Sequence, residues 1–143
     1  MSLFGAIIKC HRGFELGSET KFILCAIADD DLKDHIFKAF KDMETYSLTW
    51  VEDCGNLLLK VLDTDIDLVI IDETLPGITG STLVEIVKKT RPRIPLIVIA
   101  SGSSRQEFTK VLEQGIFYFI IKPINGEELR QAVDSGLKKS ELM

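Results

Sequence analysis

The sequence has few of the features that mark secreted, membrane-spanning or zinc-binding chains. Its three cysteines are Cys10, Cys25 and Cys54; their spacing matches no metal motif, and any disulfide scheme leaves one of them unpaired. We therefore expect reduced thiols in a cytoplasmic protein. The longest apolar runs, such as Phe117–Ile121 and Leu96–Ala100, are the length of a strand and far too short for a membrane-spanning helix.

An excess of positive charge is also absent, because the formal net charge of the 143 residues is -5. A chain without a basic surface is a poor candidate for direct contact with nucleic acid. Residues 1–20 lack the long apolar segment and small-residue cleavage site of a signal peptide. We expect them to form an irregular leader or linker, followed by one domain over residues 21–140.

From Lys21 onward, short apolar runs alternate five times with amphipathic stretches of helical period. Three of the runs consist almost entirely of Ile, Leu, Val or Phe, as expected for strands buried on both faces of a parallel sheet. The pattern predicts an α/β fold with a doubly wound five-stranded parallel sheet in the flavodoxin-like order. The predicted strands are Phe22–Ala28, Ser47–Val51, Leu68–Ile71, Leu96–Ala100 and Phe117–Ile121.

Acidic residues and one lysine follow the predicted strands, where such sheets carry their functional sites. Asp29, Asp30 and Asp31 follow the first strand, Asp72 follows the third and Lys122 follows the fifth. Clustered carboxylates repel one another unless a cation intervenes, and Mg²⁺ prefers such oxygen ligands. A carboxylate beside a metal and a lysine can attack phosphorus and form an acyl phosphate.

The stretch from Leu68 to Gly80, with Pro76 four residues and Gly80 eight residues after Asp72, resembles the phosphoacceptor motif of response-regulator receiver domains. Together with the early acidic cluster and the late Lys122-Pro123, it makes residues 21–138 similar to that family. The resemblance implies a two-component signalling switch rather than an enzyme, which accepts a phosphoryl group in a Mg²⁺-dependent reaction and slowly hydrolyses its own aspartyl phosphate.

The resemblance also implies a role for individual residues. These roles are Asp72 as phosphoacceptor, Asp29, Asp30, Asp72 and the backbone carbonyl of Thr74 as Mg²⁺ ligands, and Lys122 as the phosphate-sensing lysine, with the Lys122–Pro123 bond often cis in the family. The helix that follows the first strand leaves a second register open, in which Asp30 and Asp31 form the acidic pair.

One departure from the family concerns the switch positions. Receivers usually carry Ser or Thr at the end of the fourth strand, where this chain has Ala100. Alanine donates no hydrogen bond, and Ser101 can substitute only if the strand end twists, since successive strand residues point to opposite sides. The switch aromatic aligns with Phe119, which lacks a hydroxyl. We therefore expect a weakened or rewired conformational response.

Phe117 and Tyr118 extend an apolar run that could serve as an interaction surface, for a partner or for a homodimer, or could simply be core. The main functional hypothesis is phosphorylation by a sensor histidine kinase or phosphotransfer protein, read by an output domain or effector protein. The alternative is a phosphorylation-independent pseudo-receiver that acts as a protein-interaction module. A haloacid-dehalogenase-type phosphatase fits less well, because its nucleophile lies on the first strand and a second acid would stand where Thr74 is.

Overall fold

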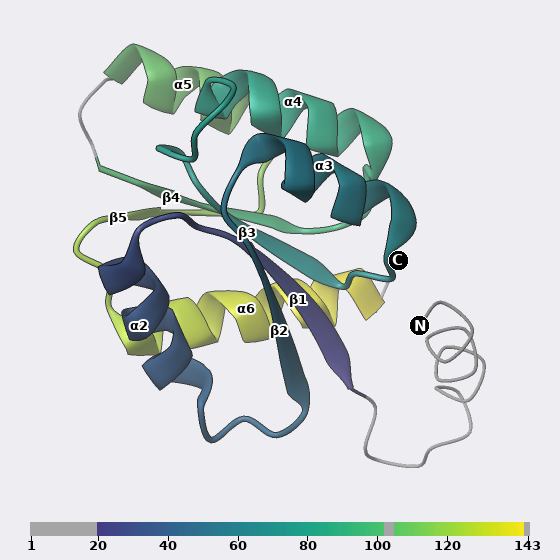
Figure 1. The fold of residues 1–143 in the computed structure, drawn as a ribbon, viewed down its shortest axis with the longest axis vertical. Helices are drawn as coiled ribbons and strands as arrows, with labels where there is room; N and C mark the ends of the chain where they lie inside the picture. Colours follow the sequence, from purple (N-terminus) through teal and green to yellow (C-terminus); the bar gives the residue numbers. More distant parts are fainter. Residues whose placement is uncertain (1–19, 102–104, 142–143) are drawn as a thin grey trace.

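The computed structural model describes residues 20–101 and 105–141, and residues 1–19 of the predicted leader lie outside that part. The described chain forms one parallel sheet between two layers of helices (Figure 1). The strand order is β2-β1-β3-β4-β5, which confirms the predicted doubly wound fold. The strands are β1 (Lys21–Ala26), β2 (Tyr46–Val51), β3 (Leu68–Asp72), β4 (Leu96–Ala100) and β5 (Tyr118–Ile121). The helices are α2 (Asp30–Phe40), α3 (Cys54–Asp63), α4 (Gly80–Thr90), α5 (Arg105–Glu113) and α6 (Gly126–Glu141).

The sheet separates two apolar cores, because successive residues of a strand point to opposite faces. In β3, Val69 and Ile71 pack on the side of α3 and α4, whereas Leu68 and Ile70 pack on the side of α2 and α6. Every residue of β3 and β4 is buried, which explains why these strands are continuous apolar runs. Figure 1 shows α3, α4 and α5 over one face of the sheet and α2 and α6 over the other.

Helix caps fix the loops at the carboxyl edge of the sheet. The Asp29 carboxylate accepts a hydrogen bond from the Asp31 N–H at 2.9 Å and starts α2. Asp53 caps α3 through the Asn56 N–H at 2.8 Å, and the Asn125 side chain caps α6. Such caps satisfy backbone donors that have no partner within the helix, and they hold the strand-to-helix turns that carry the candidate site.

Strand ends differ from the prediction by one or two residues. The strand β1 ends at Ala26 rather than Ala28, although the Ile27 N–H still donates to the Val51 carbonyl at 2.9 Å. The strand β3 extends one residue further than predicted and includes Asp72. Because β1 ends two residues earlier than predicted, the aspartates that follow it lie further from the end of the strand than the sequence suggested.

Candidate functional site

Asp72 is the last residue of β3 and is 1% exposed, the only buried polar or charged residue in the part of the chain that the structure describes. Two hydrogen bonds from Thr74 hold its Oδ1, one from the backbone N–H at 3.0 Å and one from the side-chain hydroxyl at 2.9 Å. The Leu75 N–H also donates to the Asp72 carbonyl at 3.0 Å. The turn after β3 therefore fixes the orientation of the carboxylate.

Lys122 supplies the positive charge that faces Asp72. Its Nζ lies 3.2 Å from Asp72 Oδ2, and the lysine side chain is 25% exposed. Lys122 follows β5, and its backbone N–H donates to the Ala100 carbonyl at 2.8 Å. The Lys122–Pro123 peptide bond is cis, as the resemblance implies. The structure thus brings together two of the predicted site residues from two different strand ends.

The loop between β3 and α4 depends on two glycines of the predicted motif. Gly77 has φ +127°, and a Cβ there would lie 3.0 Å from the Cβ and Sγ of Cys54. At Gly80, a Cβ would lie 3.1 Å from the Cβ of Glu73. The Cys54 N–H donates to the Pro76 carbonyl at 3.2 Å. The loop therefore packs tightly against the start of α3 and against the residue next to Asp72.

The acidic residues after β1 do not join Asp72. Asp29 is the N-cap of α2, and the Asp30 side chain is 95% exposed, with one carboxylate oxygen 3.8 Å from Lys33 Nζ. Among the described residues, no group of three or more His, Cys, Asp or Glu side chains could hold a metal ion. The structure therefore does not bring Asp29 and Asp30 into one such group with Asp72. The carboxylates present do not fit the Mg²⁺ site that the resemblance implies.

The physical reason is the register of the two strands. Ala26 pairs with Ile71, so Ile27 is the next residue along and comes level with Asp72. The aspartates begin two residues later, where the chain already turns into α2. The alternative pair of Asp30 and Asp31 lies further along still, in the first turn of that helix.

The switch positions give a hydrogen bond that the sequence did not predict. Ala100 is buried and offers no hydroxyl. The Ser101 N–H and hydroxyl donate to Glu73 Oε1 at 3.0 and 3.2 Å. Phe119 is partly buried against the core on the side of α3 and α4. Glu73, the residue directly after Asp72, thus links the end of β3 to Ser101, the residue directly after β4.

Phe117 and Tyr118 have different neighbours. The Tyr118 hydroxyl donates to Glu128 at 2.9 Å, and this hydrogen bond raises the pKa of the tyrosine. Phe117 instead lies 5.6 Å from Lys139 Nζ and lines a cavity of ≈ 170 Å³ near the amino end of β4.

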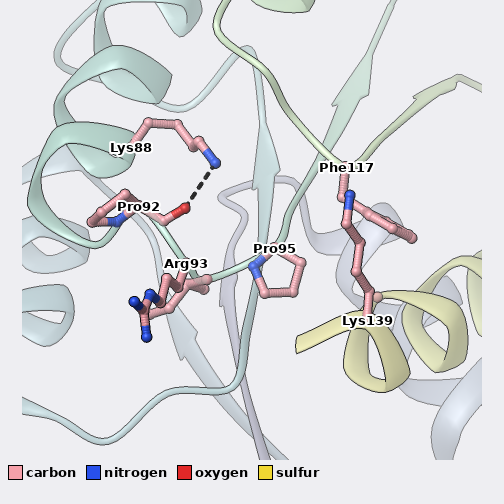
Figure 2. Close-up of a pocket in the computed structure, with 8 residues that line it drawn as sticks. Lys88, Pro92, Arg93, Pro95, Phe117 and Lys139 are labelled. Atoms are coloured by element: carbon pink, nitrogen blue, oxygen red, sulfur yellow. Dashed lines mark hydrogen bonds between the residues drawn. The ribbon is translucent and has the colours of Figure 1, made fainter. Parts of the chain in front are cut away.

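That cavity (Figure 2) is bordered by basic side chains at the carboxyl ends of two helices. Lys88 lies in the last turn of α4, where its Nζ donates to the Pro92 carbonyl at 3.1 Å, and Lys139 lies in the last turn of α6. Cations at these positions complement the helix dipoles. The cavity contains none of the residues around Asp72, so it is separate from the candidate site.

Comparison with known proteins identifies the family. The model of the response regulator receiver domain matches residues 24–134. The chain is 33% identical over 98 residues to the transcriptional regulatory protein GlrR of Escherichia coli, with 68% of this chain and 22% of that protein covered. It is 31% identical over 102 residues to the response regulator SaeR of Staphylococcus epidermidis, with 70% and 44% covered. The chain thus spans less than half the length of these relatives.

Solved structures give the same fold. A CheY-like receiver domain protein from Methanospirillum hungatei superposes with a TM-score of 0.78 at 25% identity, covering 85% of this chain and 97% of that one. The signal receiver domain of an HD domain-containing protein from Pseudomonas fluorescens superposes with a TM-score of 0.80 at 21% identity, covering 87% and 99%. No helix among the described residues is both long and apolar enough to span a membrane.

Proposed function

Since this chain belongs to the response regulator receiver family, we propose that Asp72 accepts a phosphoryl group from a histidine kinase or phosphotransfer protein. The observation that carries the proposal is the nearly complete burial of Asp72 beside Lys122. A carboxylate is rarely buried without a partner, because its desolvation is costly. Its retention at the carboxyl edge of a parallel sheet supports a chemical role.

Asp72 Oδ2 is the oxygen best suited to attack phosphorus. Oδ1 already accepts two hydrogen bonds from Thr74, whereas Oδ2 faces the Lys122 ammonium. In the transfer, the bond from phosphorus to the donor histidine breaks, a bond from phosphorus to Oδ2 forms, and the histidine nitrogen takes up a proton. Lys122 then offsets the charge of the phosphoryl oxygens.

Hydrolysis reverses the state. Water attacks phosphorus, inorganic phosphate leaves and the carboxylate returns, so the domain acts as a switch with a slow self-hydrolysis rather than as an enzyme for an external substrate. The resemblance also implies Mg²⁺ for these steps. We assign no step to a metal, because Asp29 and Asp30 do not fit the ligand set.

Phosphorylation of Asp72 must change the surface of the domain through a contact other than a hydroxyl at position 100, where this chain has alanine. The Glu73 carboxylate provides one, since it is adjacent to Asp72 and accepts both hydrogen bonds from Ser101. New negative charge on Asp72 repels the neighbouring Glu73 carboxylate, and this repulsion biases the contact between Glu73 and Ser101. We propose that an output domain or effector protein reads this change in the cytoplasm, where the buried thiols Cys25 and Cys54 stay reduced.

Intact mass after incubation with a small phosphodonor tests the acceptor. We expect wild type to gain one phosphoryl group and Asp72→Asn to gain none, with Asp31→Asn as a matched control that removes an exposed carboxylate. Uptake by Asp72→Asn at the wild-type level would mean that the site is wrong. No uptake by wild type from either a small donor or a phosphorylated histidine kinase would favour a module that works without phosphorylation.

A further inference from the structure

The residue directly after β1, which comes level with Asp72, is an isoleucine. Ala26 pairs with Ile71 as the last pair of the parallel ladder, so Ile27 and Asp72 are the residues that follow this pair. Ile27 is 0% exposed, and its N–H continues the pairing with β2 through the Val51 carbonyl at 2.9 Å. The backbone of Ile27 is therefore held in place by the sheet.

Ile27 and Asp72 also lie on the same face of the sheet. Ile27 packs in the core on the side of α2 and α6 together with Ile70, which is two residues before Asp72 on β3. Level residues on neighbouring strands are about 4.8 Å apart. A carboxylate at position 27 would thus share a cation with Asp72, and an isoleucine side chain excludes one. The next residue, Ala28, is exposed and has no oxygen in its side chain.

The aspartates that follow have other roles. The Asp29 carboxylate is engaged by the Asp31 N–H at 2.9 Å, and Asp30 and Asp31 form the acidic first turn of α2. Carboxylates in these positions stabilise a helix start through capping and through the helix dipole. Their residue type is therefore explained without a metal.

Charge balance points the same way. The predicted set of Asp29, Asp30 and Asp72 with one lysine would carry two net negative charges, which a divalent cation would neutralise. The observed pair of Asp72 and Lys122 is already neutral. A divalent cation entering beside a nearly buried neutral pair would bring two uncompensated charges, which is unfavourable in a partly desolvated site.

From this geometry we infer that the Asp72 site is a single-carboxylate site, with Lys122 as its resident counter-cation, that does not retain Mg²⁺ at low-millimolar concentration. Ala28 is the first exposed residue after β1, and a carboxylate added there is the smallest change that would supply a second oxygen ligand at this edge of the sheet. The inference rests on the proposed function, since it concerns how that same acceptor is neutralised. It predicts that any phosphoryl uptake by Asp72 is insensitive to removal of Mg²⁺.

The test is a Mg²⁺ titration followed by the backbone amide signals of Thr74 and Ile27 in nuclear magnetic resonance spectra. Wild type should give no saturable shift up to tens of millimolar Mg²⁺. Ala28→Asp should give a saturable shift with an affinity higher by roughly tenfold or more, because it adds a second carboxylate at the edge of the sheet that carries Asp72. Ala28→Asn, which adds similar volume without charge, should behave as wild type. Position 28 is exposed, so these variants are expected to fold.

Two results would overturn the inference. The first is saturable binding by wild type at low-millimolar Mg²⁺ that Asp72→Asn or Glu73→Gln abolishes, which would mean that existing carboxylates suffice. The second is a folded Ala28→Asp protein that binds no more tightly than Ala28→Asn. A phosphodonor experiment with and without chelator separates this inference from the proposed function. Phosphoryl uptake by wild type that requires Mg²⁺ would contradict the inference and support the proposed function. Uptake by Ala28→Asp but not by wild type would contradict the proposed function and support the inference.

Discussion

Removal of the Lys122 charge should destabilise the fold through Asp72. The change Lys122→Met keeps most of the length of the side chain and deletes the ammonium group 3.2 Å from Asp72 Oδ2. Breaking a buried ion pair typically lowers the free energy of unfolding by about 3–5 kcal/mol, because one charge is left uncompensated. Lys122 is 25% exposed and Thr74 still donates two hydrogen bonds, so we expect a loss of about 2 kcal/mol.

The opposite change should be milder. In Asp72→Asn, the lysine loses its partner but is partly exposed and can turn toward water, so the expected loss is about 1 kcal/mol or less. In the double variant no charge remains to be stranded. The sum of the losses of unfolding free energy in the two single variants should therefore exceed the loss in the double variant by about 1–2 kcal/mol. This difference is the coupling energy of the pair.

Urea unfolding followed by Trp50 fluorescence and far-ultraviolet circular dichroism measures all four free energies, provided the two probes give coincident transitions. A measurement at raised salt serves as a control, because a partly buried pair is screened much less than a surface pair such as Lys38–Asp34. Additivity of the two substitutions within about 0.3 kcal/mol would refute the reasoning, since independent sites add to that precision.

Three further predictions concern the surroundings of the site. Thr74→Val deletes the hydroxyl that donates to Asp72 at 2.9 Å, and the free energy of unfolding measured in urea should fall by about 1–2 kcal/mol. Gly77→Ala places a Cβ 3.0 Å from Cys54 at φ +127°, and should lower the same quantity by about 2 kcal/mol or more. Burial raises the pKa of the Cys25 thiol from 9.0 to about 12. The folded thiol thus keeps its proton where the unfolded thiol loses it, so stability should fall as pH rises through 9, by up to ~1.4 kcal/mol per pH unit.

Each of these predictions has a matched control. Thr74→Ser keeps the hydroxyl and should retain most of the stability. Gly55→Ala adds a methyl group only 3.4 Å from the Asp53 carboxylate, without a positive φ, and a loss as large as that of Gly77→Ala would contradict the explanation from strain. Cys25→Ala should flatten the alkaline fall in stability, and an unchanged slope in that variant would assign the effect to other groups such as Tyr46, whose pKa burial also raises.

The fold was predictable because its strands carry their own signal. In β3 and β4 every residue faces a helix layer, so both strands are continuous apolar runs that helical periodicity cannot imitate. The order of strands followed from five repeated units and the handedness of their connections. The exact ends were less predictable, because Ile27 is as apolar and as buried as the strand before it, although it lies outside β1.

The position at which β1 ends determined which site residues could be predicted from the sequence. Asp72 and Lys122 each stand at the end of an unambiguous strand, and the structure brings them together. The three aspartates after β1 have the residue type of metal ligands and of a helix start alike, and residue type alone does not distinguish the two. The distinction depends on register across β1 and β3, which is a property of the paired strands and not of either segment. The bond between Glu73 and Ser101 was missed for a similar reason, since it joins two loops far apart in the chain.

The residues around the ion pair of Asp72 and Lys122 bear on whether its role is structural or chemical. Ile27, directly after β1, and Ala100, at the end of β4, are both buried and apolar, so the charged pair of Asp72 and Lys122 has apolar residues at the ends of two other strands. A buried ion pair contributes little net stability compared with apolar side chains of similar volume. Packing alone therefore gives no reason for a carboxylate at the end of β3. The proposed phosphoacceptor role gives one, because Thr74 holds Oδ1 and leaves Oδ2 facing Lys122, and this role accounts for the burial, the hydrogen bonds and the single cation together.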